Sequence, residues 1–344
     1  MDRQTEITTP GALLNEKGDL ARPGFSRALV QEYRRADVKV SPLRIKEWDY
    51  YLVNNGKFAL ALTVADNGYM GLDSVSLLDL EEGWEITKSP MSFLPLGKKH
   101  LPETSVTGDV HSAARGYGIH FIHEGEKRVL IAYMNKFGES ALSARVELTE
   151  CPEDSLVIAT PFDKPGHFYY NQKIVGFRAS GYVNYNGKTY TFEPSDSFAV
   201  LDWGRGVWTY KNTWYWGSAS GELDGAPFGW NIGYGFGNTS AATENVLFYD
   251  GKIHKLGEVK FEIPMDEDGF EDFMKPWVFT SDDNRFYMNF TPVLDRSAFM
   301  SAGVVLSDQH QVFGHFTGRI TLDDGTVLPV RDFFGFAEKV ENKW

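Results

Sequence analysis

The most constraining feature of this 344-residue chain is a succession of short apolar runs separated by tight-turn signals. Four dipeptides of this kind lie between such runs: Asn55-Gly56, Asn186-Gly187, Asp250-Gly251 and Asp324-Gly325. Asn-Gly and Asp-Gly adopt the positive φ angles of type I′ turns at little cost, so each predicts a β-hairpin. Apart from a short stretch around 28–35, the 3.6-residue period of a helix does not appear. The pattern predicts an all-β protein.

The number of runs predicts two antiparallel β-barrels. Each half of the chain contains about eight or more strand-like runs, the number that closes a small barrel around side chains or one small ligand. Aromatic residues make up 15% of the chain, and they suit a pleated, half-buried surface. We expect a loop-rich N-terminal arm over 1–42, a first barrel over 43–195 and a second over 196–344.

Composition and charge limit the classes of partner that the protein is expected to bind. The formal net charge of −13 argues against nucleic acid, because phosphate binding needs clustered Lys and Arg. The polar N-terminus lacks the apolar core of a signal peptide, and no run of eighteen apolar residues predicts a membrane span. The single cysteine, Cys151, excludes an internal disulfide framework. We therefore expect a cytoplasmic protein whose partner is an apolar small molecule.

The segment from Asp202 to Gly217 is the first candidate site, because it combines charged, glycine and tryptophan residues. Asp202 and Arg205 are expected to pair through a bidentate bond. One interpretation is a structural latch that closes a barrel. The other places Asp202 and Arg205, with Trp208 and Trp216, at the rim of a ligand cavity.

The strand 228–237 has one bulky face and one nearly bare face. Its even positions are Phe, Trp, Ile, Tyr and Phe, whereas its odd positions are Gly, Asn, Gly, Gly and Gly. Side chains alternate between the faces of a strand, and a bare face is needed where a ligand or another backbone approaches. Asn231, Gly233 and Gly235 are therefore candidate ligand-binding residues, with barrel bending as the alternative explanation of the glycines.

A third candidate face lies on the strand that begins near the Pro165-Gly166 turn. His167, Asn171 and Lys173 share this face with Tyr169, and Tyr170 lies on the opposite one. A solvated face is the alternative. No dinucleotide fingerprint, phosphate loop, His-Glu-x-x-His or nucleophile elbow occurs, and His120 and His123 point to opposite faces of a strand. We expect no cofactor and no metal.

Three motifs together suggest a family. They are Asp202-Trp203-Gly204-Arg205-Gly206-x-Trp208 with Trp214-x-Trp216-Gly217, Gly166-His167-Phe168-Tyr169-Tyr170-Asn171-x-Lys173, and Phe313-Gly314-x-Phe316-x-Gly318. They resemble a bacterial family known as domain of unknown function 2804, over nearly the whole chain. That family is similar to the double-calycin group of carotenoid hydratases, tocopherol cyclases and kievitone hydratase. The resemblance implies two lipocalin-like (calycin) barrels with a largely apolar cavity, and hydration or cyclisation of isoprenoid double bonds.

Three functions remain open at this stage. The first is a cofactor-free hydratase, isomerase or cyclase for an apolar substrate, with Asp202 as the acid and His167 or Tyr170 ordering the water. This role requires that Asp202 is not locked to Arg205. The second is a non-catalytic binder or carrier of an apolar molecule. The third is a carbohydrate-active protein, for which an open groove with surface tryptophans would be expected.

Overall fold

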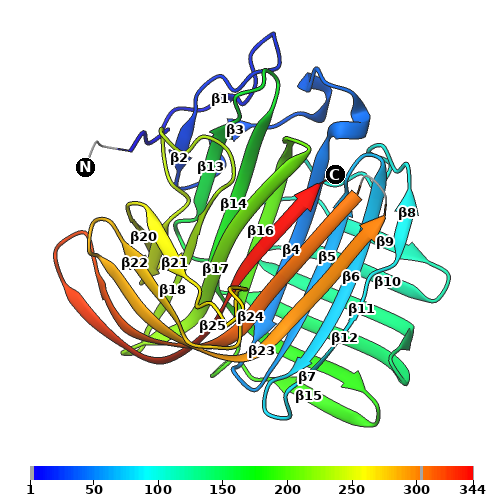
Figure 1. The fold of residues 1–344 in the computed structure, drawn as a ribbon. Helices are drawn as coiled ribbons and strands as arrows, with labels where there is room; N and C mark the ends of the chain where they lie inside the picture. Colours follow the sequence, from blue (N-terminus) through cyan, green and yellow to red (C-terminus); the bar gives the residue numbers. More distant parts are fainter. Residues whose placement is uncertain (1–3, 303–304, 344) are drawn as a thin grey trace.

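The computed structural model describes residues 4–302 and 305–343, and within them the chain is almost entirely antiparallel β structure (Figure 1). The all-β prediction is confirmed. The helices among the described residues are two 3-10 turns, η1 (Arg35–Asp37) and η2 (Pro42–Arg44). The helical expectation around 28–35 is wrong, because the arm there forms β3 (Gln31–Glu32), which pairs with β1 (Gly11–Ala12). Within these ranges no helix is both long and apolar enough to cross a membrane.

The remaining strands form two curled sheets. The 14-stranded sheet contains β2 (Gly24–Ser26), β4 (Lys46–Asn54), β5 (Phe58–Asp66), β6 (Met70–Asp79), β7 (Trp84–Lys88), β8 (Met91–Phe93), β9 (Val110–Ala114), β10 (Tyr117–Glu124), β11 (Lys127–Phe137), β12 (Ser140–Thr149), β13 (Leu156–Pro161), β14 (Phe168–Tyr185), β15 (Lys188–Phe192) and β16 (Phe198–Val207). The 9-stranded sheet contains β17 (Lys211–Leu223), β18 (Ala226–Tyr234), β19 (Val246–Tyr249), β20 (Lys252–Lys255), β21 (Val259–Glu262), β22 (Trp277–Ser281), β23 (Phe286–Ala302), β24 (Val305–Thr321) and β25 (Val327–Lys343).

All four predicted hairpins form, and two of them have type I′ turns. At Asn55-Gly56 only Gly56 has a positive φ, at 79°. Asn186 and Gly187 both have positive φ, at 49° and 75°, as a type I′ turn between β14 and β15 requires. Asp250 and Gly251 do the same between β19 and β20, at 49° and 77°.

The prediction of a type I′ turn at Asp324-Gly325 is wrong, because β24 ends at Thr321 and β25 begins at Val327. The longer connection is closed by backbone hydrogen bonds from the Leu322 amide to the Thr326 carbonyl at 2.9 Å and from the Gly325 amide to the Leu322 carbonyl at 3.0 Å. The Asp324 carboxylate also accepts a hydrogen bond from the Thr326 amide at 2.8 Å.

The chain passes from one sheet to the other between β16 and β17. β16 pairs with β4 on one side and β14 on the other, so it lies in the first sheet although it follows the boundary expected near residue 195. The division of the chain into an arm and two domains stays a prediction. What the pairing establishes is that the last strand of the first sheet, which carries Asp202 and Arg205, lies near its centre.

Each sheet carries its own buried cluster of apolar side chains. Tyr170, Trp203 and Phe121 belong to the buried cluster of the first sheet, and Trp230 and Phe316 belong to that of the second. Two further buried clusters combine residues of both sheets and hold them together. In Figure 1 the two curved sheets accordingly lie side by side, with β4, β14 and β16 next to the strands of the second sheet.

Candidate functional site

A cavity of about 310 Å³ lies between the two sheets. The resemblance implied a largely apolar cavity, and this cavity has walls from both sheets. Its aromatic lining is formed by Trp48, Tyr50, Tyr169, Trp208, Trp214, Trp216 and Phe236. These rings pack edge to face on one another, as in Trp48–Trp208 and Trp208–Phe236 at 5.3 Å. The wall is therefore an apolar, interlocked surface.

A charged pair lies in this wall. Lys173 on β14 and Asp202 on β16 are cross-strand partners, and their Nζ and Oδ1 atoms are 2.9 Å apart. The Asn171 amide donates to Asp202 Oδ1 at 2.5 Å, and the Trp48 indole donates to Oδ2 at 3.2 Å. The Lys173 ammonium also lies 3.9 Å from the ring centroid of Trp216, which comes from the second sheet. The Asp202 carboxylate is thus fully engaged as an acceptor.

Glu338 on β25 is the carboxyl group best suited to proton transfer. It is buried, and it accepts hydrogen bonds from the Trp214 indole and the Gln311 carboxamide, both at 2.9 Å. Burial raises its pKa to about 7, against the lowering influence of the Trp214 hydrogen bond and of nearby cations. Glu244 lines the same cavity, and burial raises its pKa as well. The cavity therefore contains carboxyl groups that retain protons nearer to neutral pH than ordinary glutamates.

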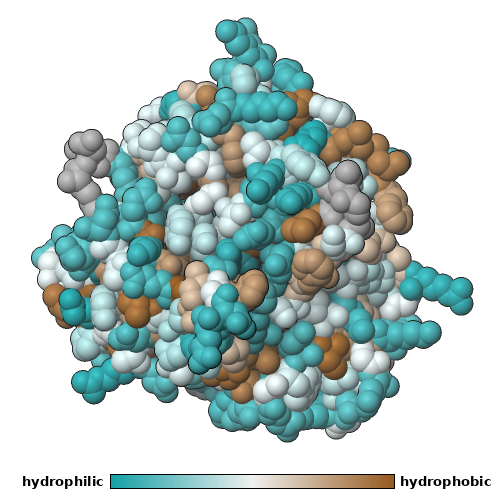
Figure 2. Space-filling view, viewed as in Figure 1, coloured by the Kyte–Doolittle hydropathy of each residue, from teal (hydrophilic) through white to brown (hydrophobic). Residues whose placement is uncertain are grey.

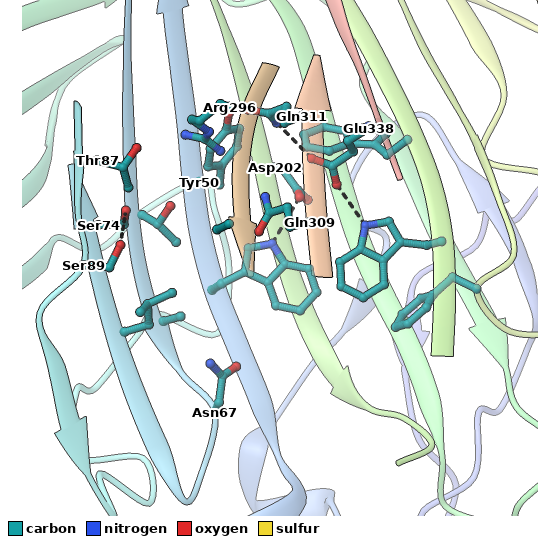
Figure 3. A pocket seen from close by; sticks show the side chains of 18 of the residues that line it. Tyr50, Asn67, Ser74, Thr87, Ser89, Asp202, Arg296, Gln309, Gln311 and Glu338 are labelled. Carbon is teal, nitrogen blue, oxygen red and sulfur yellow. Dashed lines mark hydrogen bonds between the residues drawn. The ribbon is translucent and has the colours of Figure 1, made fainter. Parts of the chain in front are cut away.

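Tyr50 and Arg296 lie at the same end of the cavity as Gln311 and Glu338 (Figure 3). The Tyr50 side chain is 7% exposed, and its hydroxyl faces the Gln311 side chain without a hydrogen bond of normal geometry to any described residue. Arg296 donates to the Ser76 hydroxyl at 2.9 Å, and its positive charge acts on both Tyr50 and Glu338. The Gln311 Oε1 atom is also buried without a partner in the described part of the chain. Polar atoms of Tyr50 and Gln311 that could bind a ligand or a water molecule therefore lie beside Glu338.

Some of the residues expected from sequence line this cavity and others do not. Lining residues are Lys173, Asp202, Trp208 and Trp216. His167 lines a separate surface hollow, where its Nδ1 atom lies 3.0 Å from the Pro165 carbonyl. Tyr170 donates to the Gln31 carbonyl at 2.7 Å from within the core of the first sheet. Burial in its own hollow lowers the pKa of His167. Asn171 does not line the cavity itself, but it hydrogen-bonds to Asp202, which does.

The expected pair between Asp202 and Arg205 is wrong. The two residues are three positions apart on one strand, so their side chains leave from opposite faces. Arg205 is fully buried and its guanidinium donates to Asp49 at 2.9 Å and to the Trp48 and Pro102 carbonyls at 2.8 and 2.7 Å. It also lies 4.2 Å from the Trp203 ring. This geometry is that of the structural latch.

The bare face of β18 is explained by contact between backbones and sheets. A Cβ atom on Gly229 would lie 2.6 Å from a methyl of Val175 in the first sheet. One on Gly233 would lie 2.7 Å from the Tyr215 carbonyl, and Gly235 has a φ of +91°. Asn231 accepts from the Trp216 indole at 2.7 Å and donates to the Glu244 carbonyl at 2.8 Å. Asn231 therefore orients two cavity residues without lining the cavity itself.

Sequence reasoning missed Tyr50, Arg296, Gln311 and Glu338 as site residues. The available signal was weak: Glu338 is an acidic residue within the otherwise mostly apolar run from 333 to 340. Their convergence depends on how the second sheet docks on the first, which strand patterns do not report. Hydrophobic side chains also gather over β8 at the surface (Figure 2), where Met91, Phe93 and Leu94 are exposed. Met91 pairs with Leu72, which lines the cavity.

The fold is shared with solved structures of low sequence identity. A Nitrosomonas europaea protein designated AttH is 13% identical, with a TM-score of 0.54, and the match covers 90% of this chain and 96% of that one. CghA in complex with Sch210972 is 11% identical, with a TM-score of 0.50 and 97% of each chain covered. Kievitone hydratase from Nectria haematococca is 10% identical, with a TM-score of 0.46 over 87% of this chain and 88% of that one. At these identities the first two likenesses show the fold alone.

No curated protein sequence matches the chain. The model of one family matches residues 4–344, which is nearly the full length. This is the family that the three sequence motifs resemble. The chain therefore belongs to the family described as domain of unknown function (DUF2804).

Proposed function

We propose that the protein is a cofactor-free lyase or isomerase that adds water to, or shifts, a carbon–carbon double bond of an apolar substrate in the intersheet cavity. The observation that carries the proposal is Glu338, a buried carboxyl group with a pKa of about 7 inside an aromatic cavity. A group of this pKa both gives and accepts a proton near neutral pH, which is the requirement for general acid–base catalysis.

The lining of the cavity supports an apolar substrate. Aromatic rings from both sheets offer a large contact surface, and a small number of polar groups converge at one end. The exposed hydrophobic residues of β8 lie next to the cavity-lining end of β6, where an apolar molecule could first contact the protein. CghA, which shares the fold, was crystallised with Sch210972.

The residues beside Glu338 suit the addition of water. The open Oε1 atom of Gln311 can accept a hydrogen bond from a water molecule held next to the carboxyl group. Glu338 gives its proton to one carbon of the double bond, and the water oxygen bonds to the other carbon. The surplus proton of the water returns to Glu338. Atoms and charge balance, and the enzyme ends in its starting state.

The role assigned to Asp202 changes accordingly. Its carboxylate accepts from Lys173, Asn171 and Trp48, so we propose that it positions Lys173 and Trp48 rather than donating a proton. His167 and Tyr170 lie outside the cavity and are not part of this mechanism. A carbohydrate substrate is disfavoured, because Trp208 and Trp216 are buried in the cavity wall instead of lining an open groove.

The test begins with native mass spectrometry of the protein purified from its own host, to identify a retained compound. That compound is then incubated in oxygen-18 water and, separately, in deuterium oxide. We expect wild type to incorporate both labels at carbon if it adds water, or deuterium alone if it shifts the double bond, and Glu338→Gln to incorporate neither while retaining the compound. Glu262→Gln, which changes an exposed carboxylate paired with Lys260, is the matched control and should behave as wild type.

The second candidate, a carrier of an apolar molecule, rests on the same aromatic lining. It predicts that the retained compound emerges unlabelled from wild type and from Glu338→Gln alike. That result would refute the catalytic proposal and leave binding as the function.

A further inference from the structure

We infer that the mouth of the intersheet cavity docks on the surface of a membrane that contains anionic phospholipids. The inference goes beyond the proposed reaction, because such a surface would serve an enzyme and a carrier alike. It starts from two features of one surface. Exposed apolar side chains flank the mouth, and exposed lysines beside them form no ion pair in the described part of the chain.

The mouth is the part of the cavity lining that solvent reaches. On the first sheet, the exposed lining residues are Thr87 at the end of β7 and Ser89 directly after it. On the second sheet, they are Ser297 and Ala298 of β23. The mouth therefore has one edge from each sheet.

Exposed apolar side chains follow both edges in the sequence. This apolar collar consists of Met91, Phe93, Leu94, Leu96, Phe299 and Met300. Phe93 is 86% exposed and Phe299 is 70% exposed. β8 carries the first two collar residues and pairs with β6 next to Leu72, which lines the cavity. Hydrophobic residues gather on the surface over β8 (Figure 2), and a group of this kind marks an interaction site.

The backbone keeps part of the collar exposed. Leu94 and Leu96 have φ angles of 51° and 52°, a left-handed conformation that is unfavourable for leucine. The Leu94 amide donates to the Tyr69 carbonyl at 2.9 Å, and the Leu96 amide donates to the Gly68 carbonyl at 3.1 Å. The turn between β5 and β6 therefore fixes both leucines in this conformation. Backbone strain of this kind is concentrated at functional sites.

The charge of this surface differs from that of the whole chain. The formal net charge is −13, yet the segment 86–102 contains three lysines and one histidine and no Asp or Glu. Lys99 is ion-paired with Asp73. Lys88 and Lys98 are exposed and have no carboxylate partner among the described residues. Two cationic groups are therefore available next to the collar.

Apolar side chains beside unpaired lysines match an anionic bilayer. Its headgroups attract lysines near the surface, and its acyl boundary accepts aromatic and leucine side chains. A second copy of this chain would instead bring its own lysines to the same surface. Asp308 is the cross-strand partner of Phe299, so the positive charge lies on the first-sheet edge of the mouth. An apolar molecule dissolved in the bilayer would then reach the cavity without crossing water.

Flotation with large unilamellar vesicles measures the docking. One set of vesicles contains phosphatidylcholine alone, and the other contains phosphatidylcholine and phosphatidylglycerol in equal amounts. We expect wild type to bind the mixed vesicles. Binding should be at least about tenfold weaker to phosphatidylcholine alone, because two lysines lose their attraction to the headgroups. It should also weaken in about 0.5 M salt, which screens exposed charges.

Phe93→Ser/Leu94→Asn tests the apolar part of the surface. Both side chains are largely exposed, and asparagine tolerates the left-handed conformation of position 94, so the melting temperature should not change. Binding to the mixed vesicles should fall at least about tenfold, because two apolar side chains no longer leave water. Met265→Ser/Phe270→Ser is the matched control. These residues are 59% and 70% exposed in the connection between β21 and β22, and their replacement should leave binding unchanged.

Lys88→Gln/Lys98→Gln tests the charge. Binding to the mixed vesicles should fall about fivefold for each lysine, and binding to phosphatidylcholine alone should not change. Lys260→Gln/Lys275→Gln changes the net charge by the same amount. These two lysines are exposed on β21 and just before β22, at the other side of the molecule from β8 (Figure 1). This control should bind as wild type does.

Three results would overturn the inference. They are the absence of wild-type binding to mixed vesicles, an equal loss of binding in a variant and its control, and a wild-type dimer that Phe93→Ser/Leu94→Asn converts to a monomer in light scattering. None of these measurements depends on turnover. Docking together with unlabelled products would refute the proposed catalysis and retain the membrane surface. Label incorporation that requires Glu338, without docking, would do the reverse.

Discussion

The ammonium group of Lys173 lies 3.9 Å from the centroid of the Trp216 ring, and this contact joins the two sheets across the cavity wall. Lys173 belongs to β14 of the first sheet, whereas Trp216 belongs to β17 of the second. The same ammonium group is ion-paired with Asp202. One buried cation therefore neutralises a carboxylate and contacts an aromatic ring of the opposite sheet.

Replacing Lys173 by Met should destabilise the protein. The variant keeps an apolar stem over Trp216 but leaves the buried Asp202 without its ionic partner, which costs about 3–5 kcal/mol in comparable sites. Urea unfolding measures the change in the free energy of unfolding. The double variant Lys173→Met/Asp202→Asn should recover much of the loss, since no uncompensated charge remains. Equal stability of the two variants would contradict this account.

Stability should depend on pH through Glu338. Its pKa is about 7 in the folded protein against an ordinary value of 4.5, so the folded state binds the proton more tightly than the unfolded state. The resulting stabilisation is complete below pH 4.5 and is lost as the pH rises through 7. Two and a half pKa units correspond to about 3 kcal/mol. Urea unfolding at pH 5 and pH 8 should show a fall in wild type that is absent in Glu338→Gln. Parallel pH profiles would exclude the raised pKa.

Replacing Arg205 by Ala should lower the free energy of unfolding by about 3–5 kcal/mol, because Asp49 would be left as a buried charge without its partner. Thermal and urea unfolding measure the loss. Arg34→Ala is the control, since Arg34 forms an exposed pair with Glu32 and its loss should leave unfolding close to that of wild type. A variant that melts like wild type but no longer binds an apolar ligand would make Arg205 a ligand residue.

Replacing Gly233 by Val should cost stability rather than selectively block the cavity. The added Cβ would lie 2.7 Å from the Tyr215 carbonyl and 2.8 Å from Glu244 Oε1, so backbone has to move. Overpacking of this kind costs about 1–3 kcal/mol. The thermal midpoint and the affinity for a fluorescent apolar probe separate the outcomes. A selective loss of probe binding at an unchanged midpoint would show that Gly233 does border the ligand.

The strands and most turns could be predicted from sequence because their signals are local. The run from Phe168 to Tyr185 is one strand, as its pattern indicates, and Asn186-Gly187 ends it. The site was only partly predictable. Lys173 and Asp202 were found through their motifs, but their partnership depends on β14 pairing with β16. Glu338 and Tyr50 are far apart in sequence and lie in different sheets, so they meet only when the sheets dock.

The cavity takes Lys173 and Asp202 from the first sheet, and Arg296, Gln311 and Glu338 from the second. Neither half of the chain therefore contains a complete site by itself. A fusion or exchange that replaced one half would have to bring a surface that matches the other. In related sequences we therefore expect substitutions on β4, β14 and β16 to covary with substitutions on β17, β24 and β25. The residues of one sheet at this interface restrict which residues the other sheet can accept.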